Sequence, residues 1–112
     1  MTIDWANEFN GAITICDLDG VIVYMNNHSV QQFHKYGGEK LIGSNLLDCH
    51  PEPSKSKLKE MLENPVDNMY ITEKNGIKKI IYQTPWKIAG KINGIVELSF
   101  QLASEMPHFF RK

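Results

Sequence analysis

The order of strand-forming and helix-forming segments constrains the fold of this chain more than any other feature. The strand-forming runs fall into two groups, and each group is divided by residues that favour tight turns. The runs cover residues 12–16 and 21–25 near the start, and 69–74, 77–87 and about 92–102 near the end. Successive strands joined by tight turns pair antiparallel. The sequence therefore predicts an α+β domain with one five-stranded antiparallel sheet.

Helix-forming segments lie between the two groups of strands. Asn26 or Asn27 can cap a helix that continues to Gly37-Gly38, with Val30 and Phe33 among its apolar positions. Residues 39–53 hold only short apolar clusters closed by prolines, which indicates brief helical turns. Residues 54–63 form a clearer amphipathic helix, with Leu58, Met61 and Leu62 on one face. We expect these helices to pack on one face of the sheet.

The two ends of the chain complete the predicted organisation. Residues 2–9 are expected to form a short N-terminal helix, since Trp5 and Phe9 share a face and Asn10-Gly11 follows. We therefore divide the chain into an N-terminal helix in 1–11, the main domain in 12–102 and a tail in 103–112.

In the last strand, the alternation of side chains predicts that one face points toward the core and the other toward water. The first set is Ile92, Val96, Leu98, Phe100 and Leu102, and the second is Glu97, Ser99 and Gln101.

Composition and charge exclude several classes of protein. With 112 residues and 42% hydrophobic positions, the chain suits one globular domain with its own core. The first half is acidic and the second basic, but the lysines are spread over several predicted elements, so we expect no nucleic-acid partner. No apolar run approaches the ~18 residues that span a bilayer, and the first residues lack the pattern of a signal peptide. We therefore expect a cytoplasmic protein with no membrane partner.

Cys16 and Cys49 are the only cysteines. Their spacing fits neither a zinc ribbon nor a redox pair, so we interpret both as free thiols.

One short motif permits an enzymatic interpretation. The run Ile13 to Ile22 resembles the first motif of the haloacid dehalogenase phosphatases, in which two aspartates act as nucleophile and acid/base. Asp17 and Asp19 would have these roles and could hold Mg²⁺. The rest of that machinery is missing from the sequence, and the two residues also suit a hairpin turn beside Gly20. We favour the turn and keep a minimal Mg²⁺-dependent phosphohydrolase as an alternative.

Histidine offers a second alternative. A heme sensor needs an axial ligand that projects into an apolar pocket, and His34 and His50 are the candidates. The helix over 54–63 contains no histidine. We therefore assign no cofactor and keep a heme-based sensor as an open hypothesis.

Several segments together resemble a PAS domain over about residues 12–102. The run Asp17 to Asn26 is similar to the PAS entry hairpin, in which an Asp/Asn-Gly turn precedes an apolar strand, a tyrosine and a helix-capping Asn. The segment 39–43 resembles the glycine ahead of the short helices, and 46–52 resembles the His-Pro-Glu entry to the long helix. Residues 75–102 resemble the three strands that end a PAS domain. Gln101-Leu102-Ala103 departs from the family, because many PAS sensors carry Asp-Ile-Thr there.

The resemblance implies a non-enzymatic sensory module in signal transduction that forms a homodimer, binds a small molecule, or does both. It specifies neither the ligand nor the signalling partner. If the last strands meet the 54–63 helix, a pocket forms between them, and its apolar lining suits a small apolar or aromatic ligand better than a charged one. The expected pocket residues are Phe33, His50, Leu58, Met61, Leu62, Tyr82, Leu98 and Phe100.

Overall fold

The computed structural model describes residues 1–112 apart from the side chain of Cys49. One antiparallel sheet carries five strands in the order β2-β1-β5-β4-β3. The strands are β1 (Ala12–Asp17), β2 (Ile22–Met25), β3 (Asn68–Lys74), β4 (Ile77–Ile88) and β5 (Lys91–Gln101). The helices are α1 (Asn27–Gln32), α2 (Leu46–Cys49) and α3 (Ser54–Glu63), with 3₁₀ turns η1 (His34–Tyr36) and η2 (Gly38–Leu41). The predicted α+β fold with a five-stranded antiparallel sheet is confirmed.

Tight turns set the strand pairs where the sequence predicted them. Asn75 and Gly76 have φ values of 53° and 78°, the backbone conformation of a two-residue hairpin turn, and they join β3 to β4. Asp17 and Gly20 close the β1–β2 hairpin through a backbone hydrogen bond of 3.1 Å from the Gly20 amide to the Asp17 carbonyl. β1 also pairs with β5, so the first and last strands lie side by side at the centre of the sheet.

The helical block matches the prediction in its caps and differs in its lengths. Asn26 caps α1 by accepting a hydrogen bond from the Ser29 amide. The helix ends at Gln32 and not at Gly37, because the chain tightens into 3₁₀ turns and the Gly38 amide reaches back to the Phe33 carbonyl at 3.0 Å. α3 has the predicted bounds.

The predicted N-terminal helix over residues 2–9 is wrong. The chain forms only turns over residues 5–8. Two carbonyl groups of this segment bond to distant residues: Ala6 accepts from the Asn26 side chain at 2.9 Å, and Asn7 accepts from the Asn27 amide at 3.1 Å. So short a segment is marginal as a helix, and its backbone is instead positioned by these long-range hydrogen bonds.

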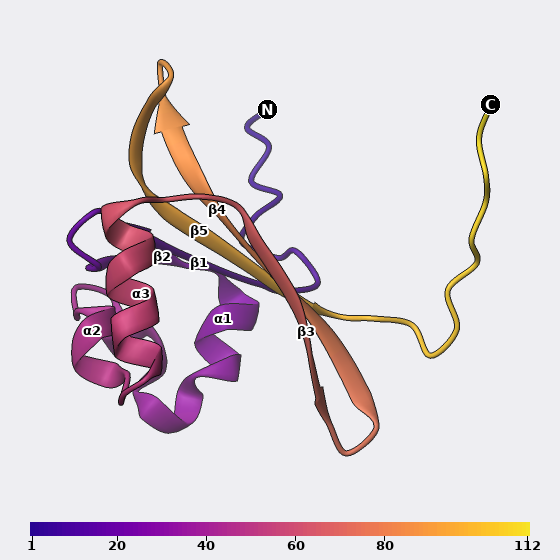
Figure 1. The fold of residues 1–112 in the computed structure, drawn as a ribbon, viewed down its shortest axis with the longest axis horizontal. Coiled ribbons are helices and arrows are strands. Elements are labelled where there is room, and N and C mark those ends of the chain that lie inside the picture. Colours follow the sequence, from indigo (N-terminus) through magenta and orange to yellow (C-terminus); the bar gives the residue numbers. More distant parts are fainter.

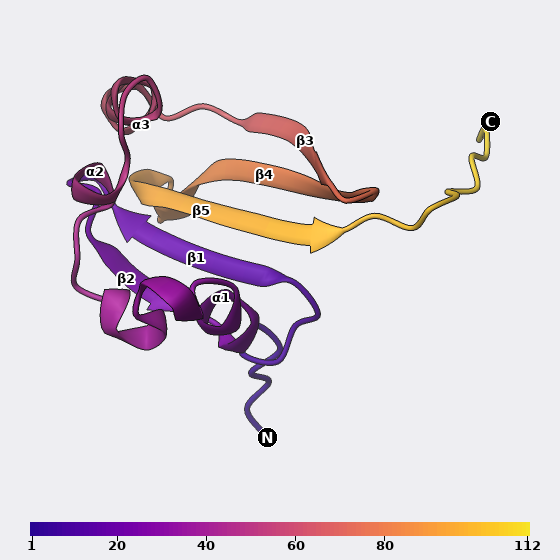
Figure 2. The same ribbon diagram turned by 90° about the horizontal axis from the view of Figure 1, so that it is seen from below.

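The sheet separates two unequal layers. Figure 2 shows the strands side by side in the order β3, β4, β5, β1 and β2, with α3 toward the β3 edge and α1 beside β1 and β2. On the face away from the helices, Phe9 of the N-terminal segment packs against Phe100. The hydrophobic core lies mainly under the helices, where Cys16, Leu62 and Ile95 are buried together. Residues 103–112 contain no helix or strand in the described chain, and they lead away from the body of the domain (Figure 1). Within the same described residues, no helix is both long and apolar enough to cross a membrane.

The predicted faces of β5 are reversed. Ile95 and Glu97 point toward the helices, and Ser99, also on that face, is only 3% exposed. Leu98 and Phe100 lie on the outer face, where the Phe9 ring packs edge-on against Phe100 with centroids 6.4 Å apart. Hydrophobicity alone misled the prediction, because the more apolar face of β5, with Val96, Leu98 and Phe100, lies away from the helices and is covered only in part.

A cavity between the helices and the sheet as the candidate functional site

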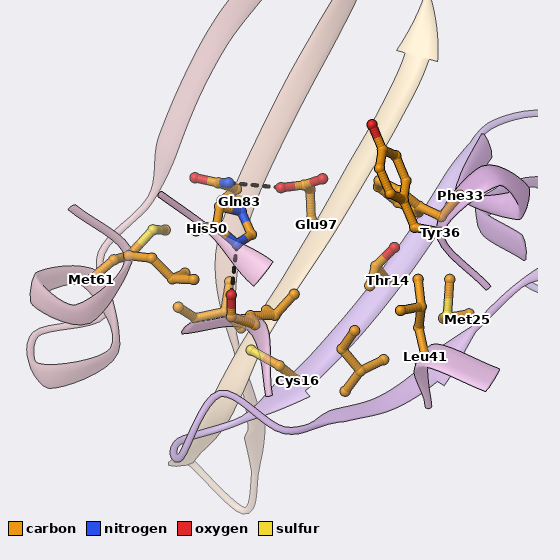
Figure 3. Close-up of a pocket in the computed structure, with 14 residues that line it drawn as sticks. Thr14, Cys16, Met25, Phe33, Tyr36, Leu41, His50, Met61, Gln83 and Glu97 are labelled. Carbon is orange, nitrogen blue, oxygen red and sulfur yellow. Dashed lines mark hydrogen bonds between the residues drawn. The ribbon is translucent and has the colours of Figure 1, made fainter. Parts of the chain in front are cut away.

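A cavity of about 550 Å³ lies between the helices and the sheet. Fourteen residues line it, and most of them are apolar (Figure 3). They are Thr14, Cys16, Ile22, Met25, Phe33, Tyr36, Leu41, Leu46, His50, Leu58, Met61, Gln83, Ile95 and Glu97.

Strand register places the polar groups of the sheet side. Glu97 on β5 lies between Thr14 on β1 and Gln83 on β4, and residues directly opposite each other in antiparallel strands point to the same face. Thr14, Glu97 and Gln83 therefore form a short polar row across the sheet that faces the helices. Ile95 and Cys16, the next pair along the same face, continue the wall with apolar surface.

The helical side contributes a more apolar wall. Leu58 and Met61 come from α3, and Phe33 comes from the end of α1. His50 follows α2, and its Nδ1 lies 2.7 Å from the Leu46 carbonyl oxygen. A carbonyl only accepts hydrogen bonds, so Nδ1 carries the proton. The bond fixes the ring at the cavity wall, as Figure 3 shows.

A chain of side-chain hydrogen bonds orients the polar row. The Asn68 side-chain amide donates to Gln83 Oε1 at 3.0 Å, and Gln83 Nε2 donates to a Glu97 carboxylate oxygen at 2.7 Å. Because the first bond fixes which end of the Gln83 amide carries the nitrogen, Gln83 presents a donor to Glu97. The Glu97 carboxylate is held in place by this neutral partner.

The pKa values of two ionisable groups near the cavity are shifted by their surroundings. Burial raises the pKa of the Cys16 thiol, and the charges of Asp17 and Glu97 add to this effect against a hydrogen bond to the backbone of Ile95. Burial also raises the pKa of Tyr70, and the Glu97 charge adds to it. Cys16 is a free, buried thiol, as predicted, while the expectation for the Cys49 thiol lies outside the described side chains.

Four of the eight predicted pocket residues line the cavity: Phe33, His50, Leu58 and Met61. Leu62 belongs to the adjacent core cluster and is 7% exposed. Tyr82 pairs with Leu98 in the sheet. These two residues and Phe100 lie on the outer face and do not reach the cavity. Sequence reasoning missed Gln83 and Glu97. Two polar residues inside apolar strands were the available signal, and only the β4–β5 register shows that they meet.

Asp17 and Asp19 are engaged in the hairpin turn. One Asp17 carboxylate oxygen accepts from the amides of Asp19 at 2.9 Å and Val21 at 3.0 Å. The part of the chain that the structure describes has no group of three or more metal-ligating side chains. These contacts agree with the turn interpretation.

The five-stranded antiparallel sheet, with short helices on one face and a cavity between the two, defines an α+β domain. The profile of the PAS fold matches residues 6–69, more than half of the chain, and the chain therefore belongs to the PAS family. No curated protein sequence matches it.

Solved structures resemble the chain at low identity. The sensor region of a sensor histidine kinase has a TM-score of 0.57 at 20% identity over 80% of this chain, which spans 38% of that protein's chain. The VqmA dimer of Vibrio cholerae, a LuxR-type receptor, has a TM-score of 0.63 at 22% identity over 92% of this chain and 53% of its own. The Aer2 receptor of Vibrio cholerae, a dual PAS-heme oxygen sensor, has a TM-score of 0.58 at 17% identity, covering 83% and 95%. These similarities show the fold.

Proposed function

We propose that this chain is a non-enzymatic sensory module in signal transduction that binds a small molecule in the cavity between the helices and the sheet. The observation that carries the proposal is the cavity itself, about 550 Å³ and lined mostly by apolar side chains with a few polar groups. Small-molecule sites in proteins have about this size and composition, roughly 300–1,000 Å³. Membership of the PAS family and similarity to a sensor region support a sensory role.

We also propose that the module acts as a homodimer. Apolar side chains remain exposed in the N-terminal segment and on β3, at Ile3, Trp5, Met69 and Ile71. Apolar surface of this kind is typical of a contact with another protein. A second copy of the chain is the occupant that we favour, because VqmA, which has a similar fold, is described as a dimer.

The first experiment is native mass spectrometry of the freshly purified protein. A retained species of small mass on each chain would support ligand binding, and the same spectrum reports the oligomeric state. A spectrum of bare monomers would contradict both parts of the proposal.

Replacing Met61 with Trp tests whether the cavity is real in solution. Met61 lines the cavity from α3, so a larger side chain can enter the open volume with little strain. We expect an almost unchanged melting temperature and loss of any retained small molecule. In a filled core the same change would cost roughly 1–3 kcal/mol, and that result would contradict a ligand cavity. Met106→Trp, at an exposed position after β5, is the matched control.

His50 supports a second candidate, a heme-based sensor. Its ring lines the cavity, whereas His34 is exposed on η1 and does not. The similar fold of Aer2, a PAS-heme oxygen sensor, is compatible with this candidate. Protein expressed with added heme would show a Soret band that disappears in His50→Ala and persists in His34→Ala. Absence of a Soret band in the unchanged protein would remove the candidate.

The phosphohydrolase alternative has weaker support, because the Asp17 carboxylate already accepts two backbone amides. A Mg²⁺-dependent phosphatase activity that Asp17→Asn abolishes would overturn the non-enzymatic proposal.

A further inference from the structure

Glu97 gives the cavity a charge that the sequence pattern did not predict. It is the one residue with a formal charge among the fourteen described residues of the lining, and it faces the helices from the centre of the sheet. Figure 3 shows the Gln83–Glu97 pair directed into the space between the sheet and α3. A partly buried carboxylate must be stabilised by hydrogen bonds or by a positive charge, since loss of water penalises its charged form.

The protein satisfies this carboxylate only in part. Gln83 Nε2 donates to one oxygen at 2.7 Å. Within the described chain, no lysine, arginine or histidine forms an ion pair with Glu97 at 4.0 Å or less. An ionised carboxylate can accept about four hydrogen bonds, so acceptor capacity remains directed at the cavity.

The neighbouring polar groups do not supply the missing donor. The His50 Nδ1 proton is donated to the Leu46 carbonyl, so it is not available to Glu97. The Thr14 hydroxyl is already 2.6 Å from the Ser29 hydroxyl. The cavity therefore combines apolar walls with a charged carboxylate whose acceptor capacity is only partly used.

We propose that the ligand carries a protonated nitrogen, as in a small aromatic or aliphatic amine or amidine, and that Glu97 pairs with it inside the cavity. This inference rests on the proposed function, because it assigns a ligand class to the same cavity. The apolar part of the ligand packs against Leu58, Met61 and Ile95, and its N–H groups donate to Glu97. A bond between two charged groups is stronger than one between neutral groups.

The proposal reverses the expectation that a charged ligand is disfavoured. That expectation counted the cost of burying an unpaired charge in an apolar pocket. Because Glu97 already places a negative charge in the cavity, a cationic ligand pairs with it, and binding of a cation becomes favourable. An anionic ligand still meets the full penalty and an added repulsion.

Three small probes of similar shape test the charge preference on the full chain. Benzylamine is cationic at pH 7, benzyl alcohol is neutral and benzoate is anionic. Titration of ¹⁵N-labelled protein, followed by the amide shifts of cavity residues such as Cys16 and Ile95, gives a Kd for each. We expect benzylamine to bind about tenfold more tightly than benzyl alcohol, and benzoate to bind more weakly than both.

Glu97→Gln keeps the size of the side chain and removes its charge. We expect the preference for benzylamine over benzyl alcohol to fall from about tenfold to about twofold or less, with benzyl alcohol binding almost unchanged. Glu73→Gln is the matched control, since Glu73 is exposed on β3 and does not line the cavity. It removes the same charge and should leave the preference unchanged, which separates a local contact from the effect of net charge.

The outcomes separate the two proposals. If all three probes bind in the cavity with equal affinity, or if Glu97→Gln leaves the preference intact, the assignment of a cationic ligand is wrong and the ligand cavity stands. If none of the probes shifts the cavity amides and native mass spectrometry shows no retained species, both proposals are wrong.

If Glu97→Gln does not fold, Gln83→Leu is used in its place. Loss of the amide donor leaves the carboxylate more dependent on the ligand, so the preference for benzylamine should be retained or increase. A lost preference in that folded variant would overturn the assignment.

Discussion

At the scale of single residues, Asn26 connects more parts of the fold than any pattern in the sequence indicates. Its side chain is fully buried. The Oδ1 atom accepts from the amides of Ile13 and Ser29, and Nδ2 donates to the carbonyls of Ala6 and Gly11, all at 2.9 Å. One amide therefore caps α1, holds the start of β1 and fixes the N-terminal segment.

Asn26→Ala should be strongly destabilising. It removes the cap, which contributes about 1 kcal/mol, and leaves buried backbone groups without partners at roughly 1–3 kcal/mol each. We expect the free energy of unfolding to fall by about 3 kcal/mol or more in urea denaturation followed by circular dichroism. The adjacent Asn27→Ala is the control, because the Asn27 side chain is exposed and its loss should cost less than about 0.5 kcal/mol. Equal effects from the two variants would contradict this role of Asn26.

At the scale of elements, the start of α3 shows how one helix is held above the cavity. Pro53 occupies the position before the helix and makes no side-chain cap. Glu52 takes this role: its carboxylate accepts from the Ser56 amide at 2.9 Å and the Ser56 hydroxyl at 2.6 Å. These two hydrogen bonds are the main cause of the lowered pKa of Glu52.

This lowered pKa predicts a pH dependence with a definite sign. A carboxyl group whose pKa is lower in the folded state stabilises the fold above its unfolded pKa, near 4.3, and loses this effect as the pH falls through the folded pKa. We expect Glu52→Gln to lower the melting temperature slightly at pH 7, with the difference from the unchanged protein shrinking toward pH 3. The effect is small because Glu52 is exposed. A difference that stays constant or grows as the pH falls would argue against the cap.

At the scale of the whole molecule, the N-terminal segment couples the two sides of the sheet. Its backbone is bonded to Asn26 and Asn27 next to α1, while Phe9 packs on Phe100 on the outer face. Trp5 is 62% exposed although it contacts Phe9, so this segment presents apolar surface beyond what the chain itself covers.

Deleting residues 1–10 should therefore affect both stability and assembly. Asn26 would lose the Ala6 carbonyl as an acceptor, and the outer face of the sheet would lose its cover over Phe100. We expect a monomer or an insoluble protein, measured by multi-angle light scattering. Ile3→Ser combined with Trp5→Ser, which keeps the backbone contacts, should weaken the dimer while leaving the monomer folded. A dimer that survives both changes would contradict a role of this segment in the interface.

Local chemistry determined much of this fold directly from the sequence. The Asn75-Gly76 turn, the Asn26 cap and the alternation of β-rich runs each depend on neighbours within a few residues, so strands and α3 could be placed from the sequence alone. The same local rules indicated the turn at Asp17. They also indicated the helix face that bears Leu58 and Met61, and these two residues line the cavity.

Only the tertiary structure decided which face of the sheet meets the helices and which polar groups the cavity holds. The face of β5 toward the helices carries Ile95 beside Glu97 and Ser99 and is the less apolar of the two, so its orientation depends on what the rest of the chain packs against it. Gln83 and Glu97 are 14 residues apart and meet because strand register aligns them. Residues 2–9 have a helical pattern but no helix, because so short a helix is marginal and the segment is positioned instead by hydrogen bonds to Asn26 and Asn27. Hydrogen bonds and burial between distant segments are absent from any local window, and in this protein they determine the site.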